Sequence, residues 1–324
     1  MFALLSSVVL SLYNVSVKII YITKPNLIFG IWNWEGIIHP GVGNSMFILF
    51  IRMVVVVLLM PAPIFIFYPS IWQHVQRLWQ NRTPRFYFQM AGCGLSMFVS
   101  QVLIYVALGE MPAGIAIAIF FIYPVVTVLI SWVLFGNRPS FMHTGSLAVI
   151  IIGILLALPS TSGAAQGHLK TGIATAMGSG ISFAISILLT QICVKTCPPL
   201  LFNLINFFIV FILSALSIFT AWIFNLWEIP LDAMGPDLIL AGGWLGVLTL
   251  ISYLLNTIAI SLTGAMFVSI VSAIGPALTA LFAFLIISEF ITLAQWGGIL
   301  LVTLSVLALG IEGILRAKHK DHSS

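Results

Sequence analysis

The sequence predicts an all-α polytopic membrane protein with ten transmembrane helices, arranged as two inverted five-helix repeats. Hydrophobic residues make up 61% of the 324 residues and charged residues only 6%, against about 25% charged in soluble domains. Apolar runs of about 20 residues, the length that spans a bilayer, recur along the whole chain. A pattern of prolines and glycines also recurs at one fixed offset of 152 residues.

The apolar runs, separated by polar and turn-forming residues, predict ten helices. Their expected bounds are 2–22, 46–67, 87–108, 113–135, 140–158, 170–193, 202–226, 238–260, 264–287 and 292–312. Two connections are longer than the rest, 23–45 and 68–85. The first carries Trp32 and Trp34, which suit the membrane interface, and a lid over a binding site is the alternative.

Ten spans leave no room for a soluble catalytic or DNA-binding domain. The net charge of +4 therefore indicates basic cytoplasmic loops rather than a nucleic-acid surface. The partners that we expect are the lipid bilayer and a small-molecule substrate, with no nucleic acid, and a homodimer stays open. The spans contain no metal-ligand cluster, catalytic pair or phosphate-binding glycine motif, so the sequence predicts no enzyme, cofactor or metal.

The distribution of Lys and Arg predicts that both termini are cytoplasmic, with the chain in the plasma membrane or bacterial inner membrane. With the N-terminus inside, only Lys24 and Lys170 lie in outer segments, and eight basic residues lie in inner ones. These eight are Arg77, Arg82, Arg85, Arg138, Lys195, Arg316, Lys318 and Lys320.

The internal repeat relates Ile119–Leu158 to Val271–Gly310. At the offset of 152 residues, the matched pairs are Pro124 and Pro276, Thr127 and Thr279, Leu129 and Leu281, and Gly145 and Gly297. Five helices in each half force the halves to enter the membrane in opposite senses, an arrangement common in secondary transporters. We expect repeats at 1–160 and 168–312, followed by a cytoplasmic tail at 313–324.

These residues resemble the EamA-type family of the drug/metabolite transporter superfamily. The family pattern is a helix with a central proline, a short turn with Gly–Glu–Arg–x–Thr, and a glycine-bearing helix. Its residues here are Pro276, Glu289, Thr292 and Gly297 in the second half, and Pro124, Gly136, Arg138 and Gly145 in the first, with Tyr13–Lys18 and Arg52 also similar. Asn137 stands where the family has a glutamate. The resemblance implies export or exchange of small metabolites, such as amino acids.

Polar residues within the spans are the candidates for a substrate site, because in hydrocarbon they must find partners or face a cavity. Ser7, Ser11, Asn14 and Lys18 share one face of the first helix. The alternative is that such residues serve packing between helices. The predicted substrate-binding residues are Asn14, Lys18, Gln101, Tyr105, Tyr123, Pro124, Tyr253, Asn256, Ser272 and Pro276.

Lys18 and Arg52 have two interpretations. Either their long side chains reach the outer interface, or they form an electropositive entrance for carboxylates or phosphates. Pro124 and Pro276 interrupt their helices at matching positions, which indicates a transport site or a structural kink. The sequence thus favours a non-ATP transporter that works by alternating access. A channel or non-transporting interaction protein is the alternative, and an intramembrane enzyme is the more remote one.

Overall fold

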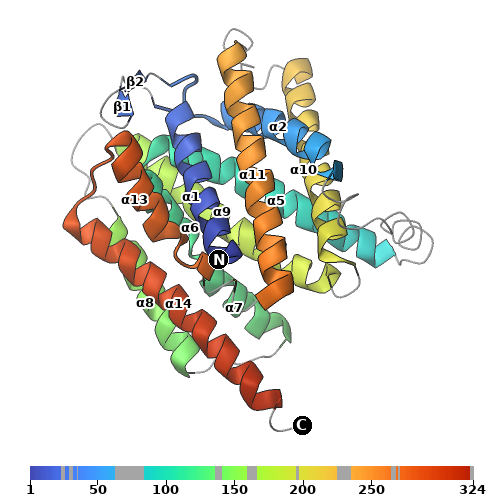
Figure 1. Cartoon of the computed structure of the whole chain (residues 1–324), viewed down its shortest axis with the longest axis vertical. Helices are drawn as coiled ribbons and strands as arrows, with labels where there is room; N and C mark the ends of the chain where they lie inside the picture. Colours follow the sequence, from blue (N-terminus) through green and yellow to red (C-terminus); the bar gives the residue numbers. More distant parts are fainter. Residues whose placement is uncertain are drawn as a thin grey trace.

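The computed structural model describes residues 1–22, 26–28, 32–34, 36–62, 84–135, 141–158, 166–194, 197–224, 235–263, 268 and 271–321. Apart from one two-stranded ribbon, the regular structure of this part of the chain is helical. The trace follows a bundle of long helices (Figure 1). The predictions that rest on Asn137, on Gly136 and on most inner-loop cations fall outside the described residues.

The first half contains most of its helices where the apolar runs predict them. Its elements are α1 (Phe2–Ile20), β1 (Asn26–Ile28), β2 (Trp32–Trp34), α2 (Val42–Leu59), α5 (Pro84–Glu110), α6 (Ala113–Phe120), α7 (Tyr123–Phe135) and α8 (Phe141–Ala157). The strands β1 and β2 pair antiparallel, with Asn26 opposite Trp34.

The described part of the second half follows the same order of helices. Its elements are α9 (Gln166–Cys193), α10 (Pro199–Phe224), α11 (Pro236–Thr263), α13 (Gly275–Ile287) and α14 (Leu293–Asp321). Eight helical segments of the described chain are long and apolar enough to cross a membrane, counting α6 and α7 as one. Two shorter apolar helices, Thr144–Ala157 and Gly275–Ile287, complete the ten predicted spans.

Two helix boundaries differ from the expected ones in an informative way. The helix expected at 46–67 already begins at Val42, because the polar residues that indicated a loop are accommodated in its first turn. Ser45 is fully buried and its hydroxyl lies 2.9 Å from the Tyr21 hydroxyl. The span expected at 113–135 is two helices, α6 and α7, and not one continuous helix.

The helix contacts have the symmetry that two inverted repeats require. The first helix, α1, packs on the eighth, α11, and the third, α5, packs on the sixth, α9. Exchanging the two five-helix halves converts one of these pairings into the other. The pairs α2 with α10, α6 with α13 and α8 with α14 each join equivalent helices of the two halves.

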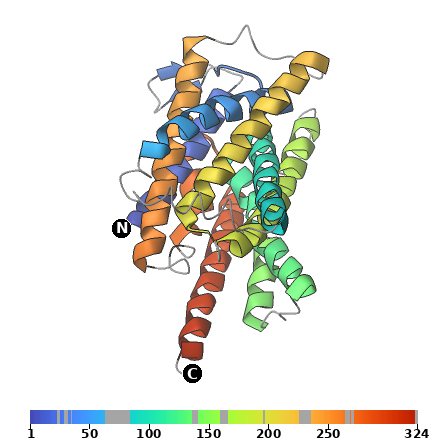
Figure 2. The same ribbon diagram turned by 90° about the vertical axis from the view of Figure 1, so that its right-hand side faces the viewer.

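The α8–α14 pair lies at one side of the bundle (Figures 1 and 2). The C-terminal end of α14 extends beyond the ends of the other helices. Glycine permits this close pairing. A β-carbon on Gly153 would lie 2.9 Å from the Gly298 carbonyl oxygen, which is tighter than real side chains allow.

Large apolar side chains cover the outside of the bundle, as expected for helices in contact with lipid. Trp222, Phe224 and Val133 are 66%, 69% and 81% exposed. Buried small and apolar residues fill the contacts between helices. The polar side chains that the interior does contain therefore stand out, and three groups of them are described below.

Candidate functional site

The fourth helix of each half is broken at the same position of the repeat. In the first half, Phe121 and Ile122 form a turn between α6 and α7, and in the second, Ala273 and Ile274 form the turn that precedes α13. These turns are 152 residues apart. Even their hydrogen bonds match: the Ile122 N–H donates to Ile119 O over 3.0 Å, and the Ile274 N–H to Val271 O over 3.3 Å.

Pro124 and Pro276 lie just after these turns and not in the middle of continuous helices. Pro276 occupies the first turn of α13, and Pro124 is the second residue of α7. Proline suits the start of a helix, where its missing N–H has no intrahelical acceptor and its fixed φ is already helical. The sequence correctly located the interruptions, but their form is a complete break rather than a kink.

The two breaks face each other across the interface between the halves. A β-carbon on Gly275 would lie 3.6 Å from the Phe121 ring. Phe120 and Tyr123 of the first half form an aromatic cluster with Phe183 of α9, in the second half, with ring centroids 5.1 to 5.4 Å apart. The interface therefore combines aromatic rings with non-helical backbone, which membranes tolerate only inside protein or beside a cavity. Ser272 is half-buried on the second-half side.

The predicted polar face of α1 lies against the second half. The Ser11 hydroxyl donates to the Gly275 carbonyl over 3.3 Å, and the Asn14 side-chain amide donates to the Thr279 hydroxyl over 3.3 Å. Ser7 instead donates to Ala3 O in its own helix. These contacts favour packing between helices for Ser11 and Asn14. Thr279, fully buried, belongs to the internal repeat and to a polar stripe of its helix in the sequence, but it was not among the predicted substrate-binding residues.

A second polar cluster lies on another face of α1 and surrounds Arg52. The Arg52 Nη1 group donates to the Tyr13 hydroxyl and, over 3.1 Å, to Gln101 Oε1. The Tyr13 and Tyr105 hydroxyls are 2.6 Å apart, and both rings lie about 5.4 to 5.5 Å from the guanidinium carbon. Three helices, α1, α2 and α5, thus converge on one cation.

Arg52 does not reach the membrane interface. It is 1% exposed and is the eleventh residue of α2, about 15 Å along the axis from the start of the helix. Glycines of α11 let α2 approach closely at this level, since a β-carbon on Gly246 would lie 3.1 Å from Arg52 O. Sequence reasoning left Arg52 out of the candidate residues, although a cation in mid-span was itself a signal.

Tyr253, on α11, lies at the edge of this cluster. Tyr253 is close enough to Arg52 to interact electrostatically and packs edge-on against Phe207, with centroids 4.8 Å apart. Asn256 follows Tyr253 by three residues on the same side of α11 and is half-buried. The structure therefore brings Gln101, Tyr105 and Tyr253 together around Arg52, and places Asn14 and Ser272 on the other side of α1.

The third polar cluster closes one end of the bundle, hereafter the Lys18 end. Lys18 Nζ donates to Met111 O over 2.9 Å and lies 3.8 Å from a Glu289 carboxylate oxygen. The other Glu289 oxygen accepts the Ala113 N–H over 2.8 Å. Burial raises the pKa of Glu289, and Lys18 and the Ala113 N–H partly offset this rise. Glu289 therefore links the two halves and does not cap its own helix.

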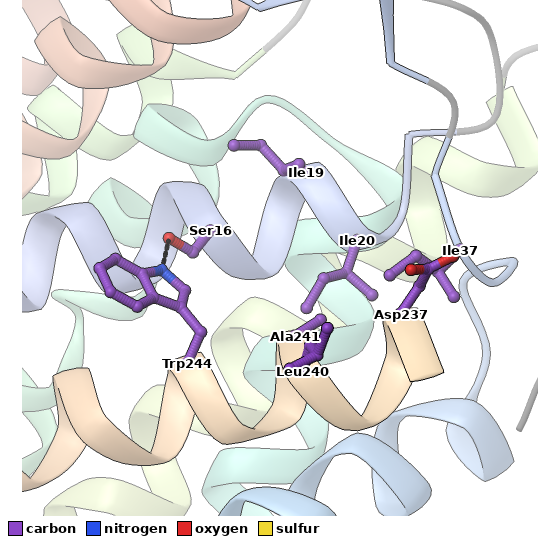
Figure 3. A pocket seen from close by; sticks show the side chains of 8 residues that line it. All are labelled: Ser16, Ile19, Ile20, Ile37, Asp237, Leu240, Ala241 and Trp244. Atoms are coloured by element: carbon purple, nitrogen blue, oxygen red, sulfur yellow. Dashed lines mark hydrogen bonds between the residues drawn. The ribbon is translucent and has the colours of Figure 1, made fainter. Parts of the chain in front are cut away.

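Near the Lys18 end, an apolar groove of about 340 Å³ lies between α1 and α11 (Figure 3). The Trp244 indole N–H donates to the Ser16 hydroxyl over 3.3 Å at one end of the groove, and Asp237 lies at the other end. The groove contains none of the predicted substrate residues. Among the residues that the structure describes, no group of three His, Cys, Asp or Glu side chains could hold a metal ion.

Two inverted five-helix halves, with broken helices that meet at their interface, define the class of the protein: a polytopic membrane transporter. The chain belongs to the EamA-like transporter family, whose pattern it matches over residues 27–158 and 170–311. This family consists of transporters and not of enzymes. The resemblance that the prolines and glycines indicated, and the all-helical duplicated fold, are thereby confirmed.

Two individual proteins are similar over nearly the whole chain. The Uncharacterized transporter sll1319 of Synechocystis sp. is 33% identical over 320 residues, which covers 98% of this chain and 94% of that protein. One solved crystal structure superposes with a TM-score of 0.55 at 16% identity, covering 95% of this chain and 93% of the other. At that identity, the structural likeness shows the fold alone.

Proposed function

We propose that this protein is a secondary transporter that exports or exchanges small metabolites, with amino acids as the default cargo, by alternating access between its two halves. The observation that carries the proposal is the pair of matched helix breaks, which face each other at the interface of the halves. Broken helices in corresponding positions of inverted repeats supply exposed backbone groups where transporters bind their cargo.

The Lys18 end supports the alternating part of the proposal. Lys18 ties α1 to the connection between α5 and α6 and, through Glu289, to the connection between α13 and α14. These contacts are few, and the side chains of Lys18 and Glu289 are 15% and 14% exposed, so water can replace the contacts when this end opens. The described conformation then corresponds to a state closed at the Lys18 end, and transport requires that this end opens.

The finer topology is also part of the proposal. Residues 1–160 and 168–312 would form the two repeats, both termini would be cytoplasmic, and the Lys18 end would face outward in the bacterial inner membrane. The eight-to-two distribution of Lys and Arg supports this orientation. Single cysteines at positions 80 and 230, in a background without the three native cysteines, should react with an impermeant reagent from the inside and the outside respectively. The reverse pattern would contradict the orientation.

Counterflow in proteoliposomes tests the function itself. Vesicles loaded with one unlabelled metabolite at a time should take up the labelled metabolite transiently above equilibrium, because a carrier exchanges solutes through one alternating site. A ligand screen by thermal shift would first select the metabolites, since a ligand that binds the native state raises its Tm. Uptake that never exceeds equilibrium and does not saturate would indicate a channel and overturn the proposal.

A further inference from the structure

We propose that Arg52 is an anion-binding residue of the transport pathway, and that it binds the carboxylate group of the cargo. This inference rests on the proposed function and narrows its substrate class to organic carboxylates. The Arg52 cluster consists of Tyr13, Arg52, Gln101, Tyr105 and Tyr253. Neither the family match nor the similar proteins assign it a role.

The charge of Arg52 is buried without compensation. The side chain is 1% exposed, and its hydrogen-bond acceptors, the Tyr13 hydroxyl and Gln101 Oε1, are neutral. Among the residues that the structure describes, no carboxylate forms an ion pair with Arg52. Buried charges in proteins are normally paired, because desolvation alone is very costly. An unpaired cation at mid-span therefore indicates a site whose counter-ion arrives from outside.

The unused hydrogen-bond donors of Arg52 have the geometry of a carboxylate site. Nη1 makes both protein hydrogen bonds, while Nε and Nη2 are buried and have no partner among the described residues. In a planar guanidinium, Nε–H and one N–H of Nη2 point in parallel from the same edge. That edge is one of the two that form paired hydrogen bonds with the two oxygens of a carboxylate. The protein thus binds the guanidinium through Nη1 and leaves the edge formed by Nε and Nη2 without a hydrogen-bond acceptor.

The surroundings fix this edge in place. The Tyr13 and Tyr105 rings lie on the guanidinium at 5.4 and 5.5 Å, and the two hydroxyls are linked at 2.6 Å. Aromatic contacts and a neutral hydrogen-bond network restrict rotation of the side chain without cancelling its charge. Such preorganisation reduces the entropy lost when a ligand binds. If Arg52 served only to hold helices together, Nε and Nη2 would also be expected to bond to the protein.

Formate is the appropriate probe, because it is the smallest carboxylate and makes no demand on the rest of the cargo. The purified full-length protein in detergent would be titrated with sodium formate, with sodium chloride at the same ionic strength and with neutral formamide. Unfolding would be followed by tryptophan fluorescence. Formate should raise the Tm saturably, by about 1 to 3 °C beyond chloride, and formamide should have no effect. Equal responses to formate and chloride would overturn the carboxylate assignment, without the need for any variant.

Variants then locate the effect. Arg52→Gln should lose the formate response, and Arg52→Lys, which keeps the charge but not the planar fork, should weaken the apparent formate affinity about tenfold. Lys170→Gln, which removes an exposed cation from α9, is the matched control and should respond like the wild type. A full response in Arg52→Gln would place the formate elsewhere and overturn the proposal, and a full response in Arg52→Lys would overturn the forked geometry.

The inference and the proposed function fail in different ways. If counterflow of carboxylates is unchanged in Arg52→Lys, Arg52 does not bind the cargo, but the protein is still a carrier. A formate response that depends on Arg52 would support the anion site. If uptake in the same protein never exceeds equilibrium, the proposal of alternating access would be wrong.

Discussion

The two cations within the bundle, Lys18 and Arg52, are both buried, but they are neutralised differently. Lys18 lies near the end of α1, and its ammonium group has a carboxylate, Glu289, and a backbone carbonyl as partners. Arg52 lies in the middle of α2, and its guanidinium has only neutral acceptors. The two residues belong to adjacent helices of the same half, so the difference does not follow from the repeat.

This contrast distinguishes the ion pair of Lys18, which stabilises the structure, from the guanidinium of Arg52, for which we propose a ligand as the counter-ion. An ion pair between the halves stabilises the closed Lys18 end, and its loss leaves a buried carboxylate behind. A buried cation without a counter-ion destabilises the ligand-free protein, and proteins retain such groups at functional sites at the expense of stability. Three sets of substitutions can break or sharpen this comparison.

The largest effect is expected for Lys18→Met. This change leaves the Glu289 carboxylate, only 14% exposed, with the Ala113 N–H as its hydrogen-bond donor among the described residues. We expect the free energy of unfolding to fall by about 1 to 3 kcal/mol, seen as a lower Tm. Adding Glu289→Gln should recover most of the loss, because a neutral amide is cheaper to bury.

The exposed Lys170 supplies the control for this experiment. Lys170→Met removes the same charge from a helix end without a buried partner, and its free energy of unfolding should stay within about 0.5 kcal/mol of the wild type. If Lys18→Met proved as mild as Lys170→Met, the ion pair would not stabilise the closed end.

Arg52→Met should have a smaller effect of the opposite sign. The change removes a charge with no counter-ion and keeps the hydroxyl contact between Tyr13 and Tyr105. Since an apolar side chain often replaces a buried charge without loss, we expect the ligand-free protein to be unchanged or stabilised by up to about 1 kcal/mol. Thermal unfolding in chloride buffer measures this change in stability. A loss of stability as large as that of Lys18→Met would mean that Arg52 serves to stabilise the fold.

The smallest effect is expected on the face of α1 that lies against α13. Asn14→Leu and Thr279→Val each remove the same 3.3 Å hydrogen bond and should each cost about 0.6 kcal/mol. The double variant should cost little more than one single variant, because both partners of the bond are then gone. Strictly additive losses would mean that Asn14 and Thr279 serve separate purposes, and a cavity-lining role of Asn14 would regain support.

The span-level organisation of the fold was predictable because it depends on composition and period, which a sequence displays directly. The helix breaks were also predictable in place, since Pro124 and Pro276 align at a fixed offset. Their form was not, because proline is equally compatible with a kinked helix and with the first turn of a new one.

The candidate site was less predictable, because helical phase shows which residues share a face but not which helix that face meets. Ser11, Asn14 and Lys18 share a face as expected, yet their partners come from α13 and from two connections distant in sequence. The position of Arg52 was visible as a mid-span cation. That its side chain stays inside depends on the close approach of α2 to α11, which only the assembled bundle reveals.

The unpaired charge of Arg52 also constrains how the chain is made. Placing an arginine at the centre of a span costs about 2.5 to 3.5 kcal/mol during membrane insertion. Its acceptor on α5, Gln101, is synthesised after α2, whereas Tyr13 on α1 is already present. The insertion cost of Arg52 therefore has to be offset by the apolar run Met53–Leu59 and by contacts with α1 until α5 has been synthesised. During biosynthesis, the first two helices behave as one hairpin unit.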